Sequence, residues 1–271
     1  MNQFPSILTI NMQKGGVGKS TIAKNLTTYL AIDKNKKVLN IDGDHLGSLS
    51  QFYDVIDQEG TIGEIFKLET DQQLKFHQVH ENIDLISYDS ELDSKEDILK
   101  EEYIKSNDKY FLLAQWLFNN KDTLSKYDFI IIDTHNDFDI FTKNAIAVSD
   151  VVIAPDRPSV TNDFNKINME LRFQNFKETL RDNNGESFIS ARFYTVGNMV
   201  ERNRKRHRQF LNDLKQKESY LTWFPNKELF INASLTIQSM ETLIKEEGNR
   251  NHDWYYDRYL EAMSSIENVL S

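Results

Sequence analysis

Cysteine is absent from the 271 residues of this chain. A chain without cysteine has no disulfide framework, no thiolate zinc site and no cysteine-ligated iron–sulfur cluster. Long hydrophobic runs are also missing, because the longest apolar stretches, such as residues 129–132, have the length of a strand and not of a membrane span. The first ten residues lack the basic start and apolar core of an export signal. We therefore expect a protein of the reducing cytoplasm.

Basic residues are in the minority, with 32 Lys and Arg against 42 Asp and Glu and a net charge of −10. This balance argues against a globally basic nucleic-acid binder, but it permits a local basic patch. Proline and glycine are scarce as well, at 4 and 10 residues, and no linker rich in them divides the chain. We expect a single domain over residues 1–271, with a mostly helical C-terminal part from about residue 237 to 271.

Runs of β-branched and large apolar residues alternate with longer amphipathic segments. This alternation predicts an α/β fold with a mainly parallel, twisted β-sheet flanked by helices on both faces. The segment "HQVHE", residues 77–81, matches no zinc motif, and we expect it on a surface helix. The expected strands are residues 7–10, 38–41, 83–87, 129–132, 151–154 and 188–196.

The stretch "NMQKGGVGKST", residues 11–21, lies between an expected strand and an expected helix. Glycines let the backbone turn tightly around an anion, and the N-terminus of the helix adds partial positive charge. The stretch predicts a P-loop NTPase, although Gln13 stands where the plain pattern has glycine. Lys19 should reach the β- and γ-phosphates, and the Ser20 hydroxyl should bind Mg²⁺. The phosphate-binding backbone is expected from Gly15, Gly16, Val17 and Gly18.

Carboxylates follow two of the expected strands: Asp42 and Asp44 in "VLNIDGDHLGSLS", and Asp133 in "YDFIIIDTHND". An acidic residue after a strand is often a turn or helix-capping residue. A magnesium–nucleotide site, however, needs carboxylates at strand ends beside the P-loop. We expect Asp133 and Asp42 to hold the water shell of Mg²⁺. Asp44 is expected to orient the attacking water, since phosphoryl transfer needs an aligned nucleophile.

Lys14 precedes the glycines, so on a P-loop its side chain should point away from the phosphates bound by its own subunit. A positive charge there can neutralise the β–γ bridging charge of a nucleotide on a facing subunit, as an arginine finger does in trans. We therefore predict that dimerisation is part of catalysis.

Four segments are similar, in order and spacing, to the motifs of the deviant Walker-A ATPases of the ParA/MinD group. The chain most resembles the small ParA-type partition ATPases, because a P-loop beginning at residue 14 leaves no room for an N-terminal helix-turn-helix domain. The four segments are "KGGVGKST" (14–21), "DGDHLGSLS" (42–50), "YDFIIIDT" (127–134) and "SDVVIAP" (149–155).

The resemblance implies ATP and Mg²⁺ as cofactors and an ATP-induced sandwich dimer in which Lys14 contacts the ATP of the partner subunit. It also implies that Thr21 joins Lys19 and Ser20 in holding the phosphates and Mg²⁺. Asn198, in "TVGNM", and the loop around Pro225 should lie at the adenine. Two segments depart from the family pattern: "DHLGS" replaces Asp-Pro-Gln, and "THND" replaces a proline pair. These departures lead us to expect altered switch geometry and slow hydrolysis without a partner.

A basic run, "ERNRKRHRQFLNDL" at residues 201–214, is expected to form a helix with its charges facing solvent. Such runs usually only solubilise a surface, but sequence-independent phosphate binding needs this concentration of charge. The family resemblance implies nonspecific DNA binding by the ATP-bound dimer. The expected DNA-binding residues are Arg202, Arg204, Lys205, Arg206 and Arg208.

These observations favour a nucleoid-associated DNA-partition ATPase whose hydrolysis is stimulated by a centromere-binding adaptor of the ParB type. One alternative is a MinD-like ATPase that positions proteins on a membrane surface. The tail "DRYLEAMSSIENVLS" has one arginine and three acidic residues, so its attraction to anionic lipid should be weak, and we expect no membrane binding. The other alternative is a weakly hydrolysing scaffold that dimerises with ATP.

Overall fold

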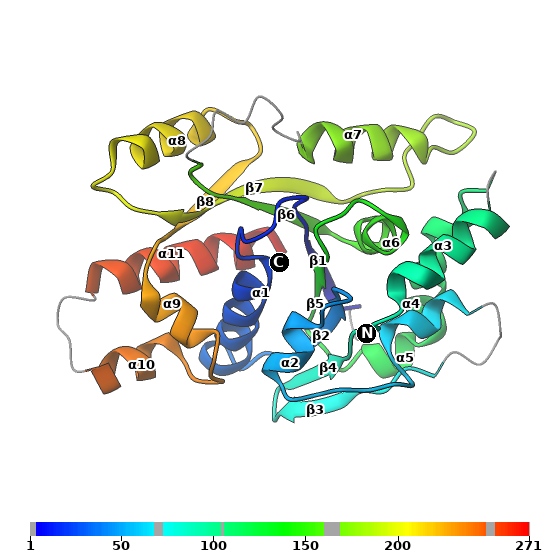
Figure 1. The fold of residues 1–271 in the computed structure, drawn as a ribbon, viewed down its shortest axis with the longest axis horizontal. Coiled ribbons are helices and arrows are strands. Elements are labelled where there is room, and N and C mark those ends of the chain that lie inside the picture. The colour runs from blue at the N-terminus through cyan, green and yellow to red at the C-terminus, as the bar shows by residue number, and fades with distance from the viewer. Residues whose placement is uncertain (1–3, 68–72, 104–105, 160–168, 248–252, 271) are drawn as a thin grey trace.

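A computed structural model describes residues 4–67, 73–103, 106–159, 169–247 and 253–270 of the chain. Its centre is an eight-stranded sheet in the order β3-β4-β2-β5-β1-β6-β7-β8 (Figure 1). All neighbouring strands are parallel except β3 and β4, which confirms the predicted α/β fold of a P-loop NTPase. The strands are β1 (Ser6–Ile10), β2 (Val38–Gly43), β3 (His77–His80), β4 (Ile83–Ile86), β5 (Phe129–Thr134), β6 (Val151–Asp156), β7 (Arg192–Val200) and β8 (Tyr220–Pro225).

Both faces of the sheet are covered because successive side chains of a buried strand point in opposite directions. In β1, for example, Ile7 belongs to the same hydrophobic core as residues of α3, α4 and α6, whereas Leu8 and Ile10 belong to the core that includes residues of α1, α2, α9 and α11. Figure 1 shows these two groups of helices on opposite sides of the sheet. The helices are α1 (Lys19–Thr28), α2 (Ser48–Phe52), α3 (Leu92–Glu102), α4 (Leu112–Asn119), α5 (Lys121–Leu124), α6 (Ile140–Val148), α7 (Met169–Thr179), α8 (Lys205–Lys215), α9 (Glu228–Ala233), α10 (Met240–Glu247) and α11 (Asp253–Leu270).

The prediction of a surface helix at residues 77–81 is wrong. His77–His80 form β3, an antiparallel edge strand that pairs with β4. A segment this short is not a stable helix by itself, whereas the sheet offers it the open edge of β4. The strand expected over residues 188–196 begins at Arg192 and continues to Val200, and β8 was not predicted at all.

The C-terminal helices α10 and α11 lie within the region expected to be helical. Helix α11 packs beside α1 on one face of the sheet, and its buried residues Tyr259, Met263 and Ile266 belong to the core shared with that helix. In the part of the chain that the structure describes, no helix combines the length and apolar character needed to cross a membrane.

Candidate nucleotide-binding site

The loop between β1 and α1 is shaped by two glycines in the left-handed region of backbone space. Gly16 has φ +67°, and Gly18, the residue before α1, has φ +89°. A Cβ atom on Gly18 would lie 2.3 Å from Nδ2 of Asn198. That amide donates a hydrogen bond of 2.7 Å to the carbonyl oxygen of Val17, so β7 supports the loop directly. The loop therefore requires glycine at residue 18 for its backbone and for space.

Lys19 is the first residue of α1 and is only 7% exposed. Its ammonium group donates a hydrogen bond to Oδ1 of Asn136, which follows β5. Burial lowers the pKa of Lys19, while the nearby carboxylates of Asp133, Asp44 and Asp137 act in the opposite direction. The cation is thus held at the edge of the sheet among carboxylates and beside the N-terminus of a helix.

Asp133 lies beside the P-loop strand, because it pairs in register with Ile10 of β1 and with Asp42 of β2. It is fully buried, and within the described part of the chain neither carboxylate oxygen has a hydrogen-bond partner. Burial, together with the Asp42 carboxylate, raises its pKa to about 7, although nearby Ser20 and Lys19 act against this shift. An unpartnered buried carboxylate beside a phosphate loop fits a site for a hard divalent cation.

The other two predicted carboxylates are engaged within the protein. Oδ2 of Asp42 accepts hydrogen bonds from the backbone and hydroxyl of Ser50, both 2.7 Å, and Oδ1 accepts one of 3.2 Å from the Asp44 backbone. Burial raises the pKa of Asp42 to about 6. Asp44 is 6% exposed, and its Oδ1 accepts a hydrogen bond of 3.0 Å from the backbone of Leu46. Asp42 therefore fixes the segment that presents Asp44 to the site.

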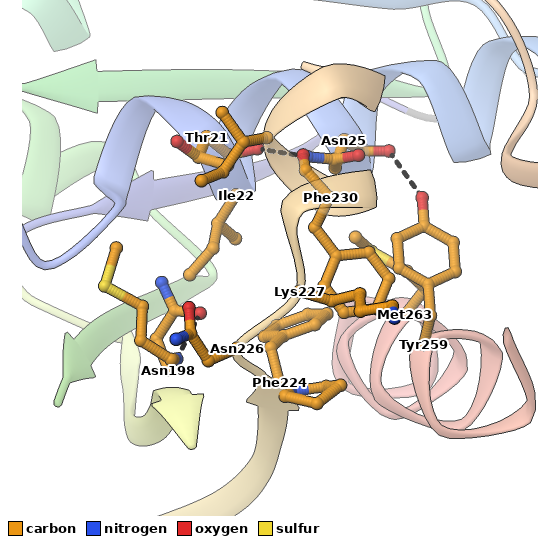
Figure 2. A pocket seen from close by; sticks show the side chains of 13 residues that line it. Thr21, Ile22, Asn25, Asn198, Phe224, Asn226, Lys227, Phe230, Tyr259 and Met263 are labelled. Carbon is orange, nitrogen blue, oxygen red and sulfur yellow. Dashed lines mark hydrogen bonds between the residues drawn. The ribbon is translucent and has the colours of Figure 1, made fainter. Parts of the chain in front are cut away.

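A narrow cleft with an internal volume of about 50 Å³ opens beside the first turn of α1 (Figure 2). Asn198 and Pro225, both predicted at the adenine, line it together with Thr21. Asn25 closes its floor by donating hydrogen bonds to the carbonyls of Thr21, 2.8 Å, and Phe230, 3.1 Å. The rest of the lining is mostly apolar, as a flat aromatic base requires. It comprises Ile22, Met199, Phe224, Asn226, Lys227, Phe230, Ile231, Tyr259 and Met263.

Several of these lining residues, and Asn136, were missed by reasoning from the sequence. Asn136 lies in "THND", directly after the Asp133 strand, and that position beside an expected metal site was a usable signal. Phe230 and Tyr259 carry no comparable signal, because α9 and α11 reach the cleft only through the tertiary fold.

The basic run is not one helix, which corrects the expectation for residues 201–214. Helix α8 begins at Lys205, and Arg202 and Arg204 lie in the loop before it. The helix starts late because the backbone of Glu201 donates to Nδ1 of His207, 2.9 Å, and its carboxylate pairs with Arg204, 2.6 Å, which closes a turn.

All five predicted DNA-binding residues are exposed. The guanidinium of Arg202 lies 4.7 Å from the ring centre of Trp254. Strand β7 links the two sites, since Asn198 at its end supports the P-loop and the basic run follows Val200.

Residues 5–175 match a family model described as an AAA domain. A solved plasmid partition protein from Borrelia burgdorferi is 30% identical and covers 90% of this chain and 100% of its own, with a TM-score of 0.67. This chain belongs to the AAA-domain family, in its ParA-type partition branch.

Other members of the family show the same likeness. A second Borrelia burgdorferi protein, solved with AMPPNP bound, is 28% identical over 98% of this chain and 99% of its own, with a TM-score of 0.70. The chromosome-partitioning ATPase Soj of Treponema pallidum is 34% identical over 152 residues, 53% of each chain. The chain thus spans about half the length of the curated relatives it matches.

Proposed function

We propose that this chain is an ATPase that partitions DNA, binding nonspecific DNA as an ATP-induced dimer and releasing it after hydrolysis. The observation that carries the proposal is the meeting of three features at one edge of the sheet. These are the glycine-dependent loop, the buried ammonium of Lys19 and the unpartnered carboxylate of Asp133. The cleft lined by Asn198 and Pro225 adjoins them.

Each residue of the proposed site has a separate role in phosphoryl transfer. The backbone of residues 15–18 and Lys19 would hold the phosphates, and Ser20, Thr21, Asp42 and Asp133 would hold Mg²⁺. Mg²⁺ supplies charge neutralisation of the phosphate oxygens when bound. Asp44 would orient the attacking water, and Lys14 of a facing subunit would complete the site. A centromere-binding adaptor of the ParB type would stimulate this step.

The alternatives have less support. Helix α11 turns Tyr259, Met263 and Ile266 into the protein core, so these apolar side chains are not available to a lipid surface. This packing favours DNA over a membrane as the surface that the dimer binds. A weakly hydrolysing scaffold would require Asp44 to orient water poorly, and its buried position beside Lys19 argues against that.

Nucleotide binding by Lys19→Ala tests the site, with Lys121→Ala as the control. Lys121 is an exposed lysine of α5, and its ammonium lies over the ring of Phe118, 5.4 Å from its centre. We expect Lys19→Ala to weaken ATP binding by about tenfold or more, since hydrogen bonds to charged groups contribute roughly 1.5–3 kcal/mol. Lys121→Ala should bind ATP as the wild type does. Equal affinity in all three proteins would remove Lys19 from the site.

A further inference from the structure

Two histidines face each other beside the nucleotide site. His45 follows Asp44 after β2, and His135 follows β5. Their ring centres are 4.0 Å apart, with the ring planes inclined at 49°. One ligand atom each from Asp44, His45 and His135 can be chosen so that all three lie within 4.8 Å of one another. The two histidines belong to "DHLGS" and "THND", the two segments that depart from the family pattern.

A carboxylate lies close to Nδ1 of each imidazole. Nδ1 of His135 is hydrogen-bonded to Oδ2 of Asp137 at 3.1 Å, which orients the ring and leaves Nε2 for another partner. Nδ1 of His45 lies 3.2 Å from Oδ1 of Asp93, in a contact without hydrogen-bond geometry. Carboxylates behind metal-binding imidazoles commonly fix the ring and raise its basicity. The side chains of His45 and His135 are 22% and 25% exposed, so an ion can enter.

We propose that Asp44, His45 and His135 form a binding site for a divalent transition-metal ion such as Zn²⁺, separate in chemistry from the Mg²⁺ of the nucleotide. Two imidazole nitrogens and one carboxylate oxygen suit Zn²⁺, Co²⁺ and Ni²⁺. Mg²⁺ prefers oxygen ligands and retains its water, so it should compete poorly. An ion bound here would join the segment after β2 to the segment after β5.

The consequence for catalysis rests on the proposed function of Asp44. A carboxylate that binds Zn²⁺ is not free to orient water. Zn²⁺ should therefore inhibit ATP hydrolysis while the P-loop and Lys19 still bind the nucleotide.

Spectroscopic titration with Co²⁺ tests the site without any nucleotide. The tag-free, metal-stripped full chain is titrated with Co²⁺, and the visible absorption of the bound ion is recorded. We expect saturation at one ion per chain, displacement by Zn²⁺ and no displacement by excess Mg²⁺. His45→Ala and His135→Ala should each weaken Co²⁺ binding by about tenfold or more. His80→Ala is the matched control, because His80 lies on edge strand β3 away from the site.

Absence of a saturable Co²⁺ band in the wild type would overturn the proposal, and so would unchanged affinity in both histidine variants. Where an alanine variant does not fold, as judged by its thermal melt, His45→Gln or His135→Gln takes its place, since glutamine is polar but lacks the imidazole. Unchanged affinity in those variants has the same meaning.

ATP turnover with and without Zn²⁺ separates this proposal from the proposed function. Inhibition of the wild type that is lost in both histidine variants supports the link to Asp44, whereas equal inhibition of all three proteins contradicts it. Absence of turnover in the wild type contradicts the proposed function, and the Co²⁺ titration then still decides the metal site.

Discussion

At the scale of single residues, the site is built around charges that the folded protein accommodates at a cost. Asp133 and Asp42 are buried neighbours on β5 and β2, and burial raises the pKa of each carboxyl. Ionising both places two negative charges side by side in a medium that solvates them poorly. The ammonium of Lys19 offsets part of that repulsion, and a divalent cation held as proposed would offset more.

Asp133→Asn should stabilise the nucleotide-free protein at high pH. The folded carboxyl holds its proton up to about pH 7, but the unfolded one loses it near 3.8. Between these values the folded state binds more protons, so the unfolding free energy falls as pH rises and levels off above pH 7. The asparagine variant lacks this loss, and its gain should reach at most about 4 kcal/mol at about pH 8.

Thermal melts across this pH range measure the effect. We expect the difference in Tm between Asp133→Asn and the wild type to be largest near pH 8 and to shrink steadily toward pH 4. Asp122→Asn, at an exposed carboxylate, is the control and should show no such trend. A gain that is constant with pH would mean that packing of the amide, and not ionisation, is responsible.

Gly18 in the loop can be tested by comparison with Gly185. Gly18 and Gly185 have similar backbone angles, φ +89° and +84°, but a Cβ on Gly185 meets nothing within 4 Å. Alanine at either position should cost roughly 1–2 kcal/mol of backbone strain. Only Gly18→Ala also collides with Asn198, so it should destabilise the protein further and abolish ATP binding. Denaturant melts and nucleotide titration measure both effects, and intact ATP binding by Gly18→Ala would contradict the described loop.

At the scale of elements, the central strands and the P-loop were predictable because their signals are local. Ile7–Ile10, Val38–Ile41 and Phe129–Ile132 are mostly apolar runs of strand length, and each leads into a segment of the site. Strand β3 has no such run, because it owes its conformation to pairing with β4. The start of α8 was mispredicted because the contact between Glu201 and His207 depends on a turn, and the pattern of charges in the sequence does not reveal that turn.

Helix α8 is the element that we expect to bind DNA. Arg206→Ala combined with Arg208→Ala should weaken DNA binding in the presence of ATP. It should also reduce the slope of log affinity against log salt by about two, because each lost phosphate contact removes about one released counterion. Lys75→Ala combined with Lys121→Ala removes two exposed lysines elsewhere in the chain and is the matched control. An unchanged slope in the α8 variant would place the DNA interface elsewhere.

At the scale of the whole molecule, the proposed function requires two chains to meet. Lys14 is half-buried in the loop before α1, and Lys19 is the first residue of that helix, so one chain has two lysines at one proposed phosphate site. A facing subunit gives the first lysine a separate role, and it would also bring two copies of the basic run onto one assembly, which multiplies phosphate contacts.

Sedimentation of Asp44→Ala should reveal this dimer, because the variant is expected to bind ATP without consuming it. With ATP and Mg²⁺ we expect a mass twice the 31.8 kDa of one chain, and with ADP a monomer. Adding Lys14→Ala to this variant should return it to the monomer. A dimer that forms equally well without Lys14 would contradict its role across the interface.

The most direct measurement is binding of the full chain to random-sequence duplex DNA with no nucleotide, with ADP and with ATP, for the wild type, Lys14→Ala and Lys19→Ala. We expect that the wild type binds DNA only with ATP and that neither lysine variant binds under any condition. Binding by the wild type that is independent of nucleotide, or no binding at all, would contradict the coupling of phosphate capture to DNA.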